Sequence, residues 1–136
     1  MGPGNRADRV LEETRRTMAD QPALDSILKE IEAIEGVHSA VLVGRSGQYL
    51  AGTIPEGATP DTFVAMFAIL VGAAETASSE LKEQLDTVIL TMEASKIVVV
   101  NDGPKAIFVL RTRKDADLGR IKTHLERFSR RIEEHL

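Results

Sequence analysis

Three histidines are the side chains in this sequence best suited to bind a metal or to transfer protons: His38, His124 and His135. No two of them are four residues apart, which is the spacing that turns two histidines of one helix toward a zinc ion. No cysteine is present to complete a ligand set. His124 falls beside the apolar positions of a predicted helix, so we interpret it as a helix-flank residue. We therefore expect no metal site.

A group of acidic residues near the carboxyl end has part of the spacing of a calcium-binding loop. Asp115 and Glu126 are placed as the first and twelfth residues of such a loop. A calcium loop needs a ligand at its fifth position and glycine at its sixth, whereas this sequence has Gly119 and Arg120 there. We interpret Asp115 and Asp117 as residues near a helix start, where the helix dipole favours negative charge.

The glycines and serines form no motif for phosphate binding or nucleophilic catalysis. Gly44, Gly47 and Gly52 lack the spacing of a phosphate-binding loop, and we interpret them as turn residues. None of the serines lies in a Gly-x-Ser-x-Gly elbow. The sequence thus predicts no catalytic residues, no cofactor and no enzymatic activity.

Composition and charge favour a compact domain with protein partners. Hydrophobic residues make up 43% and charged residues 28%, as in ordinary globular domains. The net charge of -4 argues against a nucleic-acid partner, because phosphate binding needs a basic surplus. No cysteine and no apolar leader are present, so we expect the cytoplasm. The uncharged stretch 63–74 is shorter than the ~20 residues of a membrane span, so we expect no span.

A basic cluster lies between the last predicted strand and the carboxyl end, interleaved with acidic residues. Mixed signs on one helix face are typical of solvation and local ion pairs. A docking surface for an acidic partner is the alternative. The basic residues are Arg111, Arg113, Lys114, Arg120, Lys122, Arg127, Arg130 and Arg131.

Hydrophobic periodicity divides the chain into an N-terminal extension, residues 1–22, and one domain, residues 23–136. In the extension, a helix over 6–19 carries a thin apolar stripe of Val10, Leu11 and Met18, and Asp20-Gln21-Pro22 is expected to end it. In the domain, helical spacing and β-branched runs predict these elements in turn: helix 23–35, strands 37–43 and 48–51, a long helix from 59, strands 87–93, 97–100 and 106–110, and helix 118–132.

This order predicts an α/β (α+β) fold: a three-layer α-β-α sandwich around a five-stranded antiparallel sheet. The domain runs helix-strand-strand-helix-strand-strand-strand-helix, with the extra N-terminal helix in front. Strands 97–100 and 106–110 are continuous apolar runs, so both of their faces should be covered by helices. Strand 87–93 alternates polar and apolar residues, as expected of a wetter face or a free edge.

The long second helix is apolar on more than one face. Phe63, Phe67 and Leu70 share one side, while Met66 and Ile69 lie on others. A helix that covers only one sheet needs a single apolar stripe. The second cover could therefore be another subunit.

Several segments in this order resemble the Roadblock family, which is named for a dynein light chain and includes regulators and scaffolds of Ras-like GTPases. The resemblance covers residues 24–136 and rests on structural patterns rather than catalytic motifs. The segments are Ile34-Glu35-Gly36-Val37-His38-Ser39-Ala40-Val41-Leu42-Val43, Gly47-Gln48-Tyr49-Leu50-Ala51, the apolar helix from Thr59, strand 88–92, the two apolar strands and the stripe from Leu118 to Ile132.

The resemblance implies a homodimer in which two subunits pair their second helices and the edge strands that follow. It also implies a non-catalytic binding module that regulates or scaffolds a Ras-like small GTPase or a larger complex. The alternative is a small-ligand sensor, since related three-layer folds bind metabolites. The implied dimer interface consists of Phe63, Met66, Phe67, Leu70, Thr87, Ile89, Thr91 and Glu93.

Overall fold

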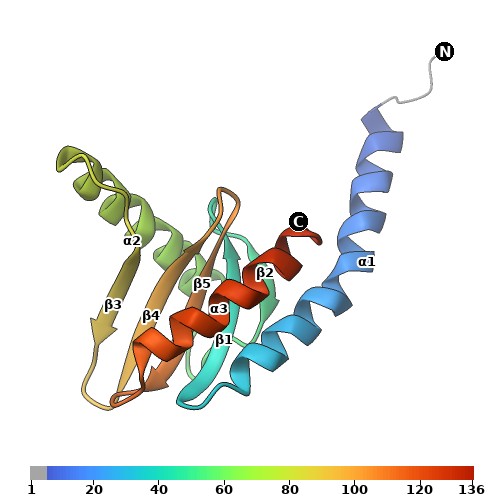
Figure 1. Cartoon of the computed structure of the whole chain (residues 1–136). Coiled ribbons are helices and arrows are strands. Elements are labelled where there is room, and N and C mark those ends of the chain that lie inside the picture. The colour runs from blue at the N-terminus through green and yellow to red at the C-terminus, as the bar shows by residue number, and fades with distance from the viewer. Residues whose placement is uncertain (1–5) are drawn as a thin grey trace.

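The computed structural model describes residues 6–136, and side-chain surroundings for all of these except 8 and 10–19. Three helices and five strands follow in the predicted order, which confirms the α+β fold (Figure 1). Their bounds are α1 Arg6–Glu32, β1 Val37–Gly44, β2 Tyr49–Gly52, α2 Pro60–Glu80, β3 Thr87–Thr91, β4 Ser95–Asp102, β5 Ala106–Arg113 and α3 Leu118–Glu133.

The five strands form one antiparallel sheet in the order β2-β1-β5-β4-β3. Strand β5 is central, because Val109 is paired with Val41 of β1 on one side and with Val99 of β4 on the other. Strand β3 is an edge, as its half-polar sequence predicted. It ends at Thr91, so Glu93 lies beyond the strand, and the predicted range of 87–93 was too long.

Helices cover both faces of the sheet, which confirms the three-layer sandwich. The second half of α1 and the whole of α3 lie on one face, and α2 lies on the other (Figure 1). Successive side chains of a strand point to opposite faces. Phe108 therefore packs with α1 and α3, whereas Ile107 and Val109 pack on the α2 side. Both faces of the central strands are covered and need apolar residues, which is why these strands are continuous apolar runs.

Helix α1 continues through Pro22, so the predicted end of a helix at residues 20–22 was wrong. Proline lacks the N–H of one backbone hydrogen bond, which bends a helix but need not stop it. The axis of α1 bends along its length in Figure 1. Next to the proline, Gln21 donates a hydrogen bond to the Leu50 carbonyl at 2.8 Å, and Leu24 is buried. These contacts hold the helical turn around Pro22 against the rest of the domain. The predicted stripe of Val10, Leu11 and Met18 lies outside the described side chains.

Asp102, at the end of β4, is a buried carboxylate with only 2% of its surface exposed. Its Oδ1 accepts a hydrogen bond from the Ser129 hydroxyl of α3. Its Oδ2 has no hydrogen-bond partner among the described residues. Burial raises the pKa of Asp102 to about 6; the nearby Glu133 carboxylate adds to this rise, and the Ser129 hydrogen bond opposes it.

This pKa predicts that stability depends on pH through Asp102. The folded pKa of about 6 lies above the reference value of 3.8. The folded state therefore binds more protons between these values, and stability falls as pH rises through that window. The Asp102→Asn variant keeps an oxygen for Ser129 without the charge. We expect it to exceed the parent by about 1–3 kcal/mol near neutral pH in urea unfolding, but not near pH 4. Equal pH profiles for the two proteins would contradict this prediction.

Candidate interaction surface on helix α2 and strand β3

Helix α2 presents apolar side chains to solvent as well as to the sheet. Val64 and Val71 are its two buried residues, and they pack on the sheet. On the opposite side, Met66 is 56% exposed and Ile69 is 62% exposed. Thr62, Met66, Ile69 and Ala73, with steps of four, three and four residues, form one exposed row along the helix. A folded chain thus leaves the outward face of this helix apolar.

The predicted interface residues on α2 occupy two different settings. Phe63, Phe67 and Leu70 are half-buried, and both phenylalanines pack against the core on the α2 side of the sheet. Their ring centroids are 4.7 Å apart, with an interplanar angle of 48°. Met66 is the predicted residue that faces outward. Ile69 is more exposed than any of these but was missing from the predicted interface, although its spacing from Met66 could have identified it.

Strand β3 exposes a further apolar residue at the sheet edge, on the face of the sheet away from α2, because its neighbours Val88 and Leu90 pack on the α2 side. Ile89 is 45% exposed and opposite Val98 of β4, while Thr91 is exposed and Thr87 is half-buried. One side of β3 is hydrogen-bonded to β4, and its other side has no neighbouring strand within residues 6–136. Such an edge leaves backbone donors and acceptors available for another strand. We call Met66, Ile69 and Ile89, with the backbone edge of β3, the α2–β3 surface.

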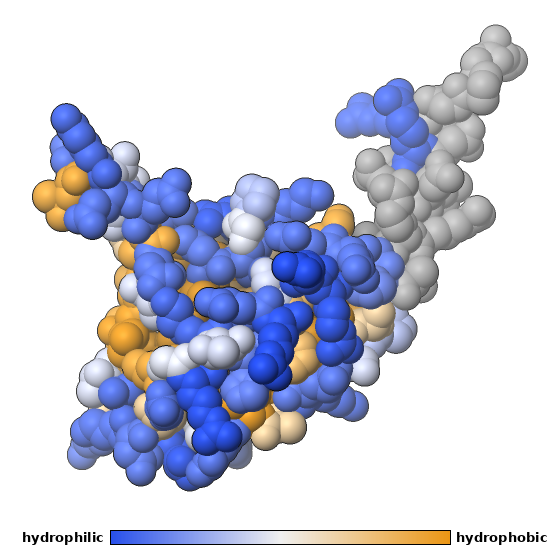
Figure 2. Space-filling model, in the orientation of Figure 1, coloured by the Kyte–Doolittle hydropathy of each residue, from blue (hydrophilic) through white to orange (hydrophobic). Residues whose placement is uncertain are grey.

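Figure 2 shows apolar atoms at the molecular surface on the side where β3 lies, and also at the projecting end of α2. Leu81, which follows α2, is 74% exposed, and Met92, which follows β3, is 39% exposed. Monomeric proteins rarely expose large contiguous apolar patches unless these bind a partner. The exposed apolar residues are therefore the strongest sign of function on the molecule.

An arginine holds α2 in position over the sheet. From the β1–β2 turn, the Arg45 guanidinium contacts Glu75 Oε1 of α2 at 2.7 Å and donates to Asn101 Oδ1 of β4 at 2.9 Å. Asn101 Nδ2 in turn donates to the Leu85 carbonyl, between α2 and β3, at 3.1 Å. This chain of contacts connects the end of α2 to the sheet.

Two other polar residues named above, Asp117 and His135, lie close to polar groups elsewhere in the chain. Asp117 begins α3, where its Oδ1 accepts a hydrogen bond from the Arg120 backbone N–H at 3.0 Å. His135 Nδ1 lies 3.4 Å from Asp20 Oδ1. Among the described residues, no three histidine or acidic side chains are grouped as metal ligands.

Part of the basic cluster forms local ion pairs, as expected for a solvated face. Arg131 contacts Glu30 of α1 at 2.7 Å, and the Arg113 guanidinium lies 3.3 Å from Asp115. Lys122 pairs with Asp86.

By length and composition alone, α2 could cross a membrane. The core helix of a soluble protein can meet the same criteria. Here Val64 and Val71 attach the helix to the sheet, so its apolar character alone does not make it a membrane span.

The sheet, its two helical layers and the exposed apolar surface define a class of small α+β interaction domains. The chain belongs to the Roadblock/LC7 domain family, whose model matches residues 23–112. The match includes α2, strands β1 to β4 and β5 up to Thr112, and it ends before α3. Roadblock/LC7 domains are generally non-catalytic and regulatory.

The chain is also similar to curated proteins and to solved structures. The chain is 29% identical over 110 residues to the uncharacterised protein MJ0714 of Methanocaldococcus jannaschii, covering 80% of this chain and 92% of that protein. An MglB structure with a tetrameric arrangement superposes with a TM-score of 0.74 at 26% identity, covering 87% of this chain and 93% of the other. The gliding protein MglB of Thermus thermophilus has a TM-score of 0.70 at 26% identity, covering 82% and 86%.

The contacts of Arg45 with Glu75 and Asn101 predict that Arg45 stabilises the folded protein. The Arg45→Met variant keeps the aliphatic stem but leaves Glu75 and Asn101 without their donor. We expect a loss of about 1–2 kcal/mol in urea unfolding, because the contacts are charge-assisted and partly shielded from water. Arg113→Met is the control, since its ion pairs are exposed and should contribute less than about 0.5 kcal/mol. Equal losses for both variants would contradict a special role for Arg45.

Proposed function

We propose that this protein is a homodimeric, non-catalytic binding module of the cytoplasm that regulates a Ras-like small GTPase by positioning it. The observation that carries the proposal is the exposed apolar row on α2. Met66 and Ile69 are each more than half exposed, on a helix with only two buried residues.

Pairing of two copies through the α2–β3 surface would remove this apolar row from water. Full burial of a side chain the size of Met or Ile contributes about 1.5–3 kcal/mol. In a two-fold dimer both subunits use the same patch, so each exposed residue is buried twice, once on each subunit. The β3 edge of one subunit would meet the β3 edge of the other and satisfy the backbone groups of both. The interface would thus include Met66, Ile69, Ile89 and the edge residues Thr87 and Thr91.

The same interface would include three residues that lie between the exposed row and the sheet: Phe63, Phe67 and Leu70. Their half-buried side chains support the exposed row and present only their outer surface to the partner. Glu93, beyond the end of β3, would lie at the rim, where a charge can remain in water.

The GTPase part of the proposal rests on the family and on its neighbours. The Roadblock family includes regulators and scaffolds of Ras-like GTPases, and the two MglB structures share 26% identity with this chain. One of them has a tetrameric arrangement, so a mass measurement should distinguish two copies from four. Positioning the GTPase needs a shaped surface and no catalytic side chain of this chain.

The dimer predicts that charge on the outward face of α2 separates the subunits. Ile69 is 62% exposed, so Ile69→Asp should give a monomer by light scattering at micromolar concentration that keeps the parent's far-UV circular dichroism, with a lower melting temperature because the stabilisation from pairing is lost. Ala33→Asp, an exposed position after α1, is the control and should remain dimeric. Phe67→Asp should instead unfold or dissociate the protein, since an unpaired buried charge costs roughly 3–5 kcal/mol. A monomeric parent protein would disprove the proposed dimer.

The regulatory role predicts binding to a Ras-like GTPase from the same cell. We expect saturable binding in a calorimetric titration with the GDP-bound or the GTP-analogue-bound GTPase. The Ile69→Asp variant should bind at least about tenfold more weakly if the paired helices form the docking surface, and Ala33→Asp should match the parent. An intact dimer that binds no such GTPase in either nucleotide state would contradict the GTPase role but leave the dimer standing.

A further inference from the structure

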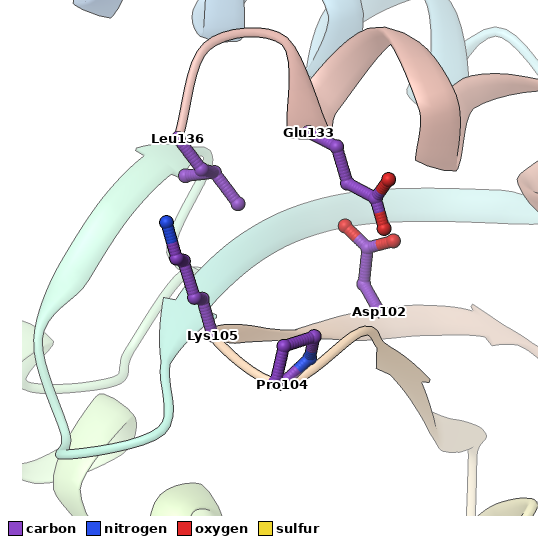
Figure 3. A pocket seen from close by; sticks show the side chains of 5 residues that line it. All are labelled: Asp102, Pro104, Lys105, Glu133 and Leu136. Atoms are coloured by element: carbon purple, nitrogen blue, oxygen red, sulfur yellow. The ribbon is translucent and has the colours of Figure 1, made fainter.

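A cleft of about 300 Å³ lies between the β4–β5 turn and the carboxyl end of α3. Five residues line it, drawn as sticks in Figure 3: Asp102, Pro104, Lys105, Glu133 and Leu136. None of these residues belongs to the α2–β3 surface, and the proposed dimer leaves them without a role.

The inner wall of the cleft is formed by Asp102 and Glu133, whose carboxyl groups face one another in Figure 3. Asp102 is 98% buried (2% exposed), and its Oδ2 has no hydrogen-bond partner within the described residues. An unpaired buried carboxylate oxygen destabilises the folded state, because it has lost its hydrogen bonds to water without gaining a donor from the protein.

Gly103 in the β4–β5 turn leaves room for the Glu133 carboxylate close to the backbone. A Cβ atom at Gly103 would come within 3.1 Å of Glu133 Oε1, so a side chain here would crowd the Glu133 carboxylate. The Gly103 backbone has φ +72°, which also favours glycine. The Gly103 carbonyl accepts a hydrogen bond from Arg45 Nε at 3.3 Å, on the exposed surface of the turn.

The remaining lining residues provide one cation, Lys105, and two apolar walls. Figure 3 draws the Lys105 ammonium group beside Leu136 and away from the two carboxyl groups. Within residues 6–136, Lys105 forms no ion pair with Asp102 or Glu133. Pro104 and Leu136 supply carbon surface at the sides of the cleft.

We propose that this cleft binds an organic cation, an alkylammonium or alkylguanidinium group, with its charged head between Asp102 and Glu133. Its N–H groups would donate to Asp102 Oδ2 and to the Glu133 carboxylate, and its carbon chain would lie against Pro104 and Leu136. Charge-assisted hydrogen bonds of this kind are among the strongest in proteins.

An N–H cation suits the cleft better than a bare metal ion. Calcium takes six to eight oxygen ligands, whereas two carboxylates are the acidic groups lining this cleft. An ammonium or guanidinium group needs only acceptors for its own N–H bonds, and the apolar walls match its carbon chain.

Binding should weaken in acid. Burial raises the pKa of Asp102 to about 6, so this carboxyl group is ionised only above that pH. The charged group that faces it is Glu133 from α3; Lys105 lines the same cleft but lies beside Leu136, and Arg45 of the β1–β2 turn contacts the Gly103 carbonyl next to it. Protonation of Asp102 as pH falls through about 6 would remove one of the two charges that hold the cation.

The test is a residue-resolved NMR titration of the full chain with n-butylammonium near pH 7.5, with n-pentanol as a neutral probe of similar size. We expect saturable shifts in residues 102–105 and 133–136 with the ammonium ion only. Affinity should fall at least about tenfold in Asp102→Asn and on acidification to about pH 5. Lys105→Met should bind equally or more tightly, because it removes a competing cation.

The matched control is Asp86→Asn, which removes a carboxylate that also faces α3 but lies outside this cleft. Its affinity should equal that of the parent. The proposal is overturned if the parent shows no saturable shift, if n-pentanol shifts the same residues equally, or if Asp102→Asn binds as well as the parent. A cooperative urea-unfolding transition of Asp102→Asn is the check that this variant is folded.

A second titration identifies the source of the cation. N-acetyl-lysine methylamide carries the same ammonium group on a peptide unit. Affinity at least about tenfold above that of n-butylammonium would support a lysine side chain of a bound protein as the natural ligand. Equal affinities would support a free amine. Binding of neither compound would overturn the site.

Discussion

The structure depends on one constraint: the central strands of its sheet are apolar on both faces, so both faces must be covered. Helices α1 and α3 share one face. The other face has α2 alone, and α2 contributes only Val64 and Val71 as buried residues. Because the same helix is apolar on its outward side, a layer that completes the core also creates a surface that water does not favour.

The α2–β3 surface follows from that arrangement. Arg45 connects the end of α2 to β4 through Glu75 and Asn101, which fixes the orientation of the exposed row relative to the sheet. Strand β3 lies at the edge of the same sheet, and within residues 6–136 no strand pairs with its outer side. In our proposal the partner meets the apolar face of α2 and the edge of β3. Recognition by these two elements depends on shape and needs no reactive side chain.

A different physical principle applies where the β4–β5 turn meets α3. There the buried group is a carboxylate, and its second oxygen has no donor among the described residues. Apolar exposure and an unpaired buried charge are both costs to the folded chain. In our proposals each cost is relieved by a partner of the matching kind: a carbon surface for α2 and an N–H cation for Asp102. The two sites share no lining residue, although Arg45 contacts both Glu75 of α2 and the Gly103 carbonyl beside the cleft.

The sequence by itself determined the elements and their layers, since runs such as Ile97 to Val100 report burial through local residue type and spacing. It also predicted that β3 has either a wetter face or a free edge, and the structure places it at the edge. Only the tertiary structure decided that α1 continues through Pro22, that Ile69 is more exposed than Phe67, and that Asp102 faces Glu133. The reason is that periodicity records which side of a helix or strand is apolar. Which neighbour covers that side, and which distant residue meets it, is set by packing between elements far apart in the chain.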